Sequence, residues 1–284
     1  KFHRILFRPS FAVQARELTQ SQTILQNQIE RLSDHFFEKG TMVIPGEIGY
    51  DLNYYAVKLS SIASGFTLSS FSVGDILTGG TSGVTATIIN SVATDGTDPD
   101  TLYVKYSTTG TDNVANTFSD GETITSNAAT PVSAVVDTTA TGSAAEVQQG
   151  IYYINGFQVQ VDNQVVILDK YTNTPSYRVG LTVTESFVTP NDDTSLNDNA
   201  AGSSNVNAPG AHRFKILLTL AKKTLTSTED ANFVELLRLN NGILQNQVRN
   251  TEYAILEDTF ARRTFDESGD YAVKDFDLDL RESL

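Results

Sequence analysis

The chain of 284 residues contains no cysteine, so it has no disulfide, no thiolate metal site and no cysteine nucleophile. It also lacks long apolar runs, because none approaches the roughly 18 residues that cross a bilayer as a helix. The first ten residues, KFHRILFRPS, lack the apolar core of a signal peptide. We therefore expect no membrane insertion.

Positive charge is scarce in the middle of the chain. The whole chain has 20 Lys and Arg against 34 Asp and Glu, but residues 59–209 have only Lys105, Lys170 and Arg178 against fifteen acidic residues. Because Lys and Arg contacts to phosphate dominate affinity for nucleic acid, we expect no nucleic-acid partner. An acidic surface rich in Thr, Ser and Gly is typical of a solvated β-sheet, with a carbohydrate or a cation as the alternative partner.

Motifs that carry catalysis are absent as well. The three histidines, His3, His35 and His212, lie in unrelated contexts, and the sequence has no HExxH, no GxSxG and no phosphate-binding loop. Adjacent carboxylates such as Glu257 and Asp258 are no evidence for a saccharide cleft. We therefore predict that the chain is not an enzyme and has neither catalytic residues nor a cofactor.

Two acidic clusters carry the oxygen ligands that calcium prefers. Neither cluster has EF-hand spacing, and Asp is a common turn former in exposed loops. We therefore predict turns at both places and no metal site. The clusters are Asp95, Asp98 and Asp100, and Asp192, Asp193 and Asp198.

Residues 12–39 are the clearest helical segment. Pro9-Ser10 before it and Gly40 after it are start and stop signals, and a helix of this length would be about 40 Å long. Residues recur along it at alternating steps of three and four, the spacing of a coiled-coil seam. The seam consists of Ala15, Leu18, Gln22, Leu25, Ile29, Leu32 and Phe36.

This seam has two interpretations. In the first, identical chains associate along it, and the polar Gln22 sets the register. In the second, the helix is amphipathic and packs on the core of its own domain. We favour self-association, because glutamines at positions 14, 20, 22, 26 and 28 leave much of the helix polar but uncharged.

The pentapeptide ILQNQ occurs at residues 24–28, inside this helix, and again at residues 243–247. The second copy comes after an apolar run and Asn241-Gly242, and an Asn-Gly pair between such runs predicts a β-hairpin. The second copy is therefore predicted to be a strand. A helix over residues 229–240 is the alternative, since Thr228 is an acceptable cap.

The rest of the chain has the composition of strands, so we predict an α+β fold that is mostly β. The similar octapeptides FSVGDILT (71–78) and FSDGETIT (118–125) indicate a small β-barrel or sandwich, and IYYINGFQVQV (151–161) predicts a hairpin. Residues 251–263 are predicted to be a helix and 275–280 a strand. We predict four segments: an N-terminal helical segment (1–58), an inserted β domain (59–145), an antiparallel β domain (146–228) and a hairpin, helix and strand (229–284) that lead to a further domain.

An insertion that folds alone must leave near the point where it enters its parent domain. We therefore predict that Ser60 and Ala145 lie within about 10 Å of each other, the span of three extended residues.

Five blocks resemble, in this order, a family of virion structural proteins of tailed phages, especially contractile-tailed phages of cyanobacteria. The resemblance covers most of residues 1–58 and 146–284 and implies a baseplate or tail-fibre component with no known catalytic residues. The blocks are RILFRPSFAVQARELTQSQTILQNQIERLSDHFFEKGTMVIPG, GIYYINGFQVQV, LDKYTNTPSYRVGLTVTES, NDDTSLNDNAAGSSNVNAPGAHRFKI and FARRTFDESGDYAVKDF.

Together with the seam, this resemblance leads us to expect a homotrimeric structural protein of the virion tail, present in the host cytoplasm during assembly, with other baseplate or tail proteins as partners. The alternative is that the β insertion binds a receptor or host-surface glycan through Tyr103, Tyr106 or Phe118, although core packing explains these residues as well. A polysaccharide-degrading tailspike is the least favoured interpretation.

Overall fold

The computed structural model describes residues 2–44, 46–228, 231–247 and 254–270. It is mostly β with one helix toward each end, which confirms the predicted α+β class. The helices are α1 (Ala15–Ser33) and α2 (Ala254–Ser268). The strands are β1 (Met42–Ile44), β2 (Ile48–Ile62), β3 (Ile76–Gly79), β4 (Thr85–Val92), β5 (Thr101–Thr108), β6 (Thr123–Ser126), β7 (Ser133–Val147), β8 (Gly150–Ile154), β9 (Phe157–Val161), β10 (Gln164–Asp169), β11 (Tyr177–Val188), β12 (Arg213–Thr224), β13 (Phe233–Asn240) and β14 (Ile243–Gln247).

The chain divides into two compact units. The first comprises residues 1–44, 151–158 and 249–284, and the second comprises residues 45–150 and 159–248. The second unit therefore contains residues 59–145 together with residues 159–248. The four predicted segments remain a prediction about which parts fold independently.

Six strands of the second unit close into a barrel. They are ordered β7-β2-β5-β4-β3-β6, and β6 pairs again with β7, so the sheet closes on itself. Alternate side chains point inward because successive residues of a strand face opposite sides. The buried side chains inside are Val57, Leu59, Phe71, Leu77, Val84, Ala86, Ile88, Leu102, Val104, Phe118, Ile124, Val132, Ala134 and Val136.

The two similar octapeptides adopt the same local structure. Each begins with a buried Phe and places a carboxylate where it accepts a hydrogen bond from the backbone N–H three residues earlier. The glycine before that carboxylate has a φ of 96° in the first copy and 79° in the second, and the next strands, β3 and β6, pair with each other. The near-repeat therefore forms the same turn twice, once before β3 and once before β6. The bonded pairs are Ser72–Asp75 (3.0 Å) and Ser119–Glu122 (2.6 Å).

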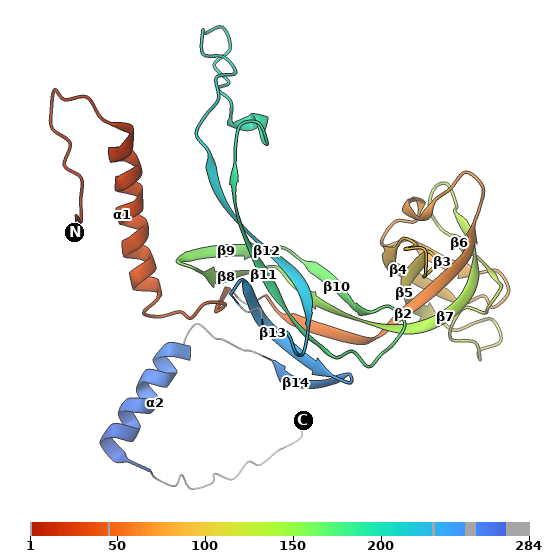
Figure 1. The fold of residues 1–284 in the computed structure, drawn as a ribbon. Coiled ribbons are helices and arrows are strands. Elements are labelled where there is room, and N and C mark those ends of the chain that lie inside the picture. Colours follow the sequence, from red (N-terminus) through yellow and green to blue (C-terminus); the bar gives the residue numbers. More distant parts are fainter. Residues whose placement is uncertain (1, 45, 229–230, 248–253, 271–284) are drawn as a thin grey trace, which may run out of the picture. The chain divides into compact units, whose positions relative to one another are not determined.

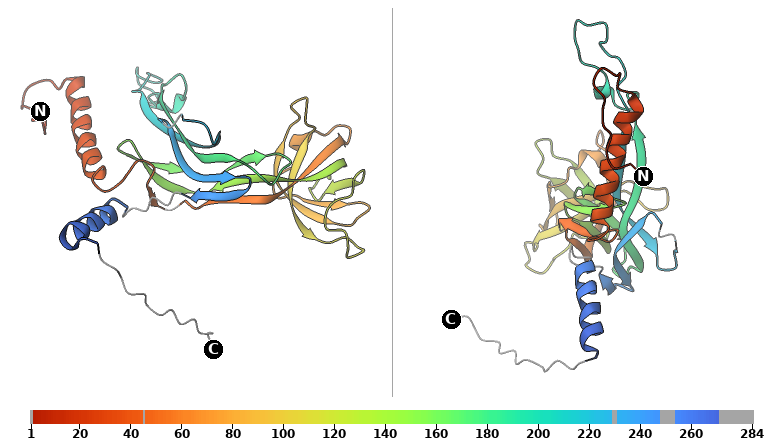
Figure 2. Two further views of the ribbon diagram at one scale, coloured as in Figure 1. Left: turned by 60° about the horizontal axis from the view of Figure 1, so that its bottom comes forward. Right: turned by 90° about the vertical axis from the view of Figure 1, so that its left-hand side faces the viewer.

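The chain enters and leaves this barrel through β2 and β7, which pair antiparallel over most of their length (Figures 1 and 2). Ser60 lies beside Val135, whereas Ala145 pairs with Tyr50. Ten residues of strand separate Tyr50 from Ser60, a distance of about 33 Å at the usual rise per residue. The predicted approach of Ser60 to Ala145 is therefore wrong, because the two ends of the insertion run side by side as a long ladder and do not close at one point.

Both predicted Asn-Gly hairpins are confirmed. Asn241 (φ 50°) and Gly242 (φ 75°) connect β13 to β14, and Asn155 (φ 47°) and Gly156 (φ 87°) connect β8 to β9. Two consecutive left-handed residues form the type I′ turn, whose twist matches that of paired strands. The second ILQNQ is strand β14 in the sheet β12-β11-β13-β14, and the alternative helix is wrong over the described residues 231–240.

The second predicted helix is confirmed as α2, although it continues to Ser268. The sequence predicts a turn at residues 266–269 that ends the helix, but residues 266–268 are still helical. Gly269 follows the last helical residue, has a φ of 63° and donates its N–H to the carbonyl of Phe265 (2.7 Å). The strand predicted at residues 275–280 lies outside the described residues.

Candidate functional site

Helix α1 carries the predicted seam and begins three residues later than predicted. Ser10, with a φ of 67°, lies in a turn before the helix. The backbone N–H of Gln14 donates to the Glu17 carboxylate (2.8 Å), half of the reciprocal pattern that caps helix N-termini. The start at Ala15 leaves every seam residue from Ala15 to Leu32 on the helix.

The end of α1 is fixed by contacts that local sequence does not show. The Tyr153 hydroxyl lies 2.5 Å from Asp34 Oδ1 and 3.4 Å from the Glu30 carbonyl oxygen, and the ring of Phe37 packs on the ring of Tyr153 at 5.6 Å. The helix therefore ends at Ser33 and is about 28 Å long, shorter than predicted. Phe36 lies beyond the helix.

One face of α1 packs on the turn between β8 and β9. Gln26 Nε2 donates to the carbonyl oxygen of Gly156 (2.9 Å). A Cβ on Gly156 would lie 2.9 Å from the side chain of Glu30, so only glycine allows the helix this close. Gln26 and Glu30 are four residues apart and thus share this face.

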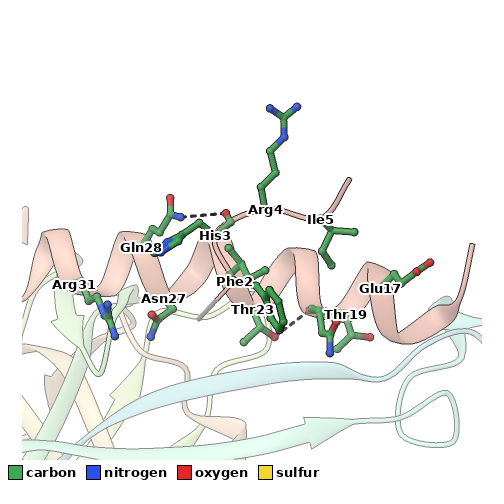
Figure 3. Close-up of a pocket in the computed structure, with 12 residues that line it drawn as sticks. Phe2, His3, Arg4, Ile5, Glu17, Thr19, Thr23, Asn27, Gln28 and Arg31 are labelled. Atoms are coloured by element: carbon green, nitrogen blue, oxygen red, sulfur yellow. Dashed lines mark hydrogen bonds between the residues drawn. The ribbon is translucent and has the colours of Figure 1, made fainter. Parts of the chain in front are cut away.

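A second face of α1 lies beside the N-terminal segment, residues 2–5, which runs along the helix (Figure 3). Gln28 Nε2 donates to the His3 carbonyl oxygen at 3.5 Å. A groove of about 680 Å³ lies between helix and segment, lined by Phe2, Ile5 and Ile24 among others. None of the seven seam residues lines this groove.

The six seam residues from Ala15 to Leu32 occupy the remaining face of α1, and these six and Phe36 are all exposed. The exposed fraction is 59% for Leu18, 60% for Leu25, 55% for Ile29 and 63% for Leu32. Among the described residues, none of the seven seam side chains is buried, and both interpretations of the seam stay predictions. Large apolar side chains aligned on one exposed face mark an interaction surface more often than an ordinary solvated one.

The histidines lie on separate parts of the chain. His3 lines the groove beside α1, the ring of His35 packs edge-on against Phe36 at 5.8 Å, and His212 lies between β11 and β12.

Both acidic clusters are engaged in local bonds. Lys170 Nζ lies 2.6 Å from Asp95 and 2.8 Å from Asp98, while the Asp192 and Asp193 carboxylates accept from backbone N–H groups of their own turn. Backbone hydrogen bonds, then the Lys170 ammonium, hold the pKa of Asp95 well below its usual range. In the part of the chain that the structure describes, no three His, Cys, Asp or Glu side chains are grouped so that they could hold a metal ion.

Of the three aromatic residues considered for ligand binding, two belong to the core. Tyr103 is fully buried and stacks on Tyr54 at 4.9 Å, and Phe118 is 2% exposed. Tyr106 is half-buried, and its ring meets Tyr55 edge-on at 5.2 Å. Only Tyr106 remains available to a ligand.

Sequence reasoning missed Tyr153 and Gly156, the residues that fix the position of α1. The Asn-Gly pair indicated the hairpin but not its partner α1, which lies more than a hundred positions away along the chain.

No helix in the described residues is long and apolar enough to cross a membrane.

The model of one protein family, described as a domain of unknown function (DUF4815), matches residues 102–283, well over half of the chain. The chain belongs to the DUF4815 family. The DUF4815 match begins in β5 and includes α2, but it leaves out α1 and its seam. No curated protein and no solved structure matches the chain.

Proposed function

We propose that this DUF4815 chain is a structural component of a phage tail, either a baseplate-attached fibre or its adaptor, and that it assembles as a homotrimer through the seam of α1. The single observation that carries the assembly is the exposure of the whole seam while the other two faces of α1 contact the β8–β9 turn and residues 2–5. The placement in a virion tail is supported by the resemblance of the sequence blocks to tail proteins. On this proposal the role is structural, with other tail proteins as partners.

The energetics of seam burial favour association. Fully burying a Leu or Ile side chain contributes about 1.5–3 kcal/mol, and each chain offers Leu18, Leu25, Ile29 and Leu32. Because Gln26 and Tyr153 already hold the helix in place, little ordering of the helix opposes association. Gln22 lies midway along the seam, where a polar side chain disfavours shifted registers.

The experiment measures the mass of the full chain in solution by multi-angle light scattering. We expect the parent chain to have three times the 30.9 kDa of one chain. Leu25→Asp and Ile29→Asp should yield single chains or aggregates, because each variant would bury an unpaired charge in the seam.

Two controls separate the seam from other effects of a new aspartate. Gln20→Asp carries the same helix-propensity cost on a different face of α1, and Val114→Asp replaces an apolar residue that is 79% exposed in the second unit. Both controls should keep the parent mass. A monomeric parent chain, or trimers that survive Leu25→Asp, would refute the proposal.

Binding of a receptor or host-surface glycan is the second candidate function. It is favoured by one specific observation, a hollow lined by Tyr55 and Tyr106, two tyrosines that pack against the core of the barrel.

A further inference from the structure

The strands β2 and β5 diverge at one end of their pairing. They pair only over residues 55–58 of β2 and 101–104 of β5. Before Tyr55, β2 continues along β7, and after Val104, β5 continues along β4. A hollow of about 580 Å³ lies where the two strands separate, within the range of small-molecule sites.

Two tyrosines supply an aromatic wall to this hollow. Tyr55 comes from β2 and Tyr106 from β5, and both are half-buried, with their ring centroids 5.2 Å apart. The Tyr106 hydroxyl accepts a hydrogen bond from the Phe118 backbone N–H (3.3 Å), which fixes the ring. Burial raises the pKa of Tyr106 to about 12, so the phenol stays neutral near pH 7.

Polar side chains surround the aromatic wall. Asp51 and Asn53 lie four and two residues before Tyr55 on β2, where a register shift between Asp51 and Tyr54 interrupts the regular pairing with β7, and all three residues line the hollow. Lys105, Asn116 and the half-buried Thr117 also line the hollow, and the side chains at positions 51, 53, 105 and 116 are exposed. The amide side chains both donate and accept, Lys105 donates, and Asp51 accepts.

We propose that this hollow binds a neutral hexose unit of a glycan. A sugar hydroxyl both donates and accepts, which suits alternating amide, carboxylate and ammonium groups, and the C–H face of a sugar ring suits a tyrosine face. Asp51 and Lys105 balance each other, so the hollow has no net charge with which to select an ion.

The surrounding charge disfavours an anionic sugar. The barrel segment from Asp75 to Asp137 has eight acidic residues and one basic residue, Lys105. Like charges repel, so a phosphorylated or carboxylated ligand would be opposed by this field. The glycan proposal is independent of the seam of α1, because the hollow is built from a single chain.

The test is saturation-transfer NMR on the full chain with D-glucose, D-galactose, D-mannose and N-acetyl-D-glucosamine, and with D-glucuronate as the anionic comparison. We expect transfer to at least one neutral sugar. Asn53→Ala and Asn116→Ala should each weaken its binding about three- to tenfold, the effect of losing one or two hydrogen bonds. Asn205→Ala, an exposed Asn in the loop between β11 and β12, should bind as the parent does.

The outcomes are distinct. The proposal is overturned if none of the neutral sugars binds, if binding is unchanged in both Asn53→Ala and Asn116→Ala, or if glucuronate binds more tightly than glucose. Light scattering on the same two variants should give the parent mass, so failure of the glycan proposal can be told apart from failure of the seam.

Discussion

The Tyr153 hydroxyl donates to Asp34 Oδ1 over 2.5 Å and thereby links strand β8 to the residue just after α1. Tyr153 is 2% exposed, so water can replace Asp34 as the partner of its hydroxyl only at a cost, whereas the Asp34 carboxylate is exposed. Helix ends fray unless such contacts fix them. The orientation of the exposed seam therefore depends on a contact made on another face of the helix.

Tyr153→Phe should loosen the end of α1 without disturbing its packing. The ring would still contact Phe37, but the bonds to Asp34 and the Glu30 carbonyl would be lost, at a cost of about 1 kcal/mol. Hydrogen exchange measured by mass spectrometry should be several-fold faster at residues 28–33. Tyr177→Phe is the matched control, because it removes a similar bond to Asp169 (3.0 Å) in the second unit. Equal exchange in the two variants would contradict the anchoring role.

A buried carboxylate, Glu122, makes barrel stability depend on pH. It is 4% exposed and accepts hydrogen bonds from the backbone N–H groups of Thr81, Ser82 and Ser119 and from the Ser82 hydroxyl. Burial is the largest single effect and opposes ionisation, but these bonds together outweigh it, so the pKa of Glu122 lies below its ordinary 4.5. The stabilisation is present above pH 4.5 and is lost as the pH falls through the lower pKa of the folded chain.

Glu122→Gln should therefore lower the free energy of unfolding by about 1–3 kcal/mol near neutral pH, because the amide cannot accept all of these bonds. The difference between parent and variant should shrink as the pH falls below 4.5 and through the lower pKa that Glu122 has in the folded parent. Urea unfolding at a series of pH values measures both. Asp75→Asn, at the equivalent position of the repeat, removes one carboxylate contact from Ser72 and should cost less. A difference that does not vary with pH would show that the charge of Glu122 is not what the bonds stabilise.

Local pattern was enough to predict the elements that carry their own signal. The three-and-four spacing from Ala15 to Leu32 predicted α1, and Asn-Gly pairs predicted both hairpins, because periodicity and left-handed turns depend on neighbouring residues. The same reasoning separated the two ILQNQ segments. Identical pentapeptides form a helix and a strand because their flanking residues, not their own propensities, decide the structure.

Features set by distant contacts were not predictable in this way. The early end of α1 depends on Tyr153, and the ladder between β2 and β7 pairs residues that are between 72 (Ile62 and Ala134) and 99 (Ile48 and Val147) positions apart. The hollow exists because β2 runs along β7 while β5 runs along β4, a divergence that no alternation pattern shows. Asp51 and Asn53 are a weak signal, because two polar residues interrupt the apolar and aromatic residues of this strand.

The turn before the second ILQNQ provides the last prediction. Gly242 has a φ of 75°, and an added Cβ would lie 2.9 Å from the Asn173 carbonyl oxygen. Gly65 has a φ of 87°, but an added Cβ there meets nothing within 4 Å. Gly65→Ala should therefore lower the free energy of unfolding of the second unit by about 1–2 kcal/mol, the cost of a left-handed backbone alone. Gly242→Ala should lower it further, since the clash pushes residues 173–175 away and weakens the bond from Gly242 N–H to the Pro175 carbonyl oxygen (2.9 Å). Urea unfolding followed by circular dichroism measures the free energy of unfolding of both variants. If both variants lose the same free energy, residues 173–175 move aside at no cost and do not fix the β13–β14 turn.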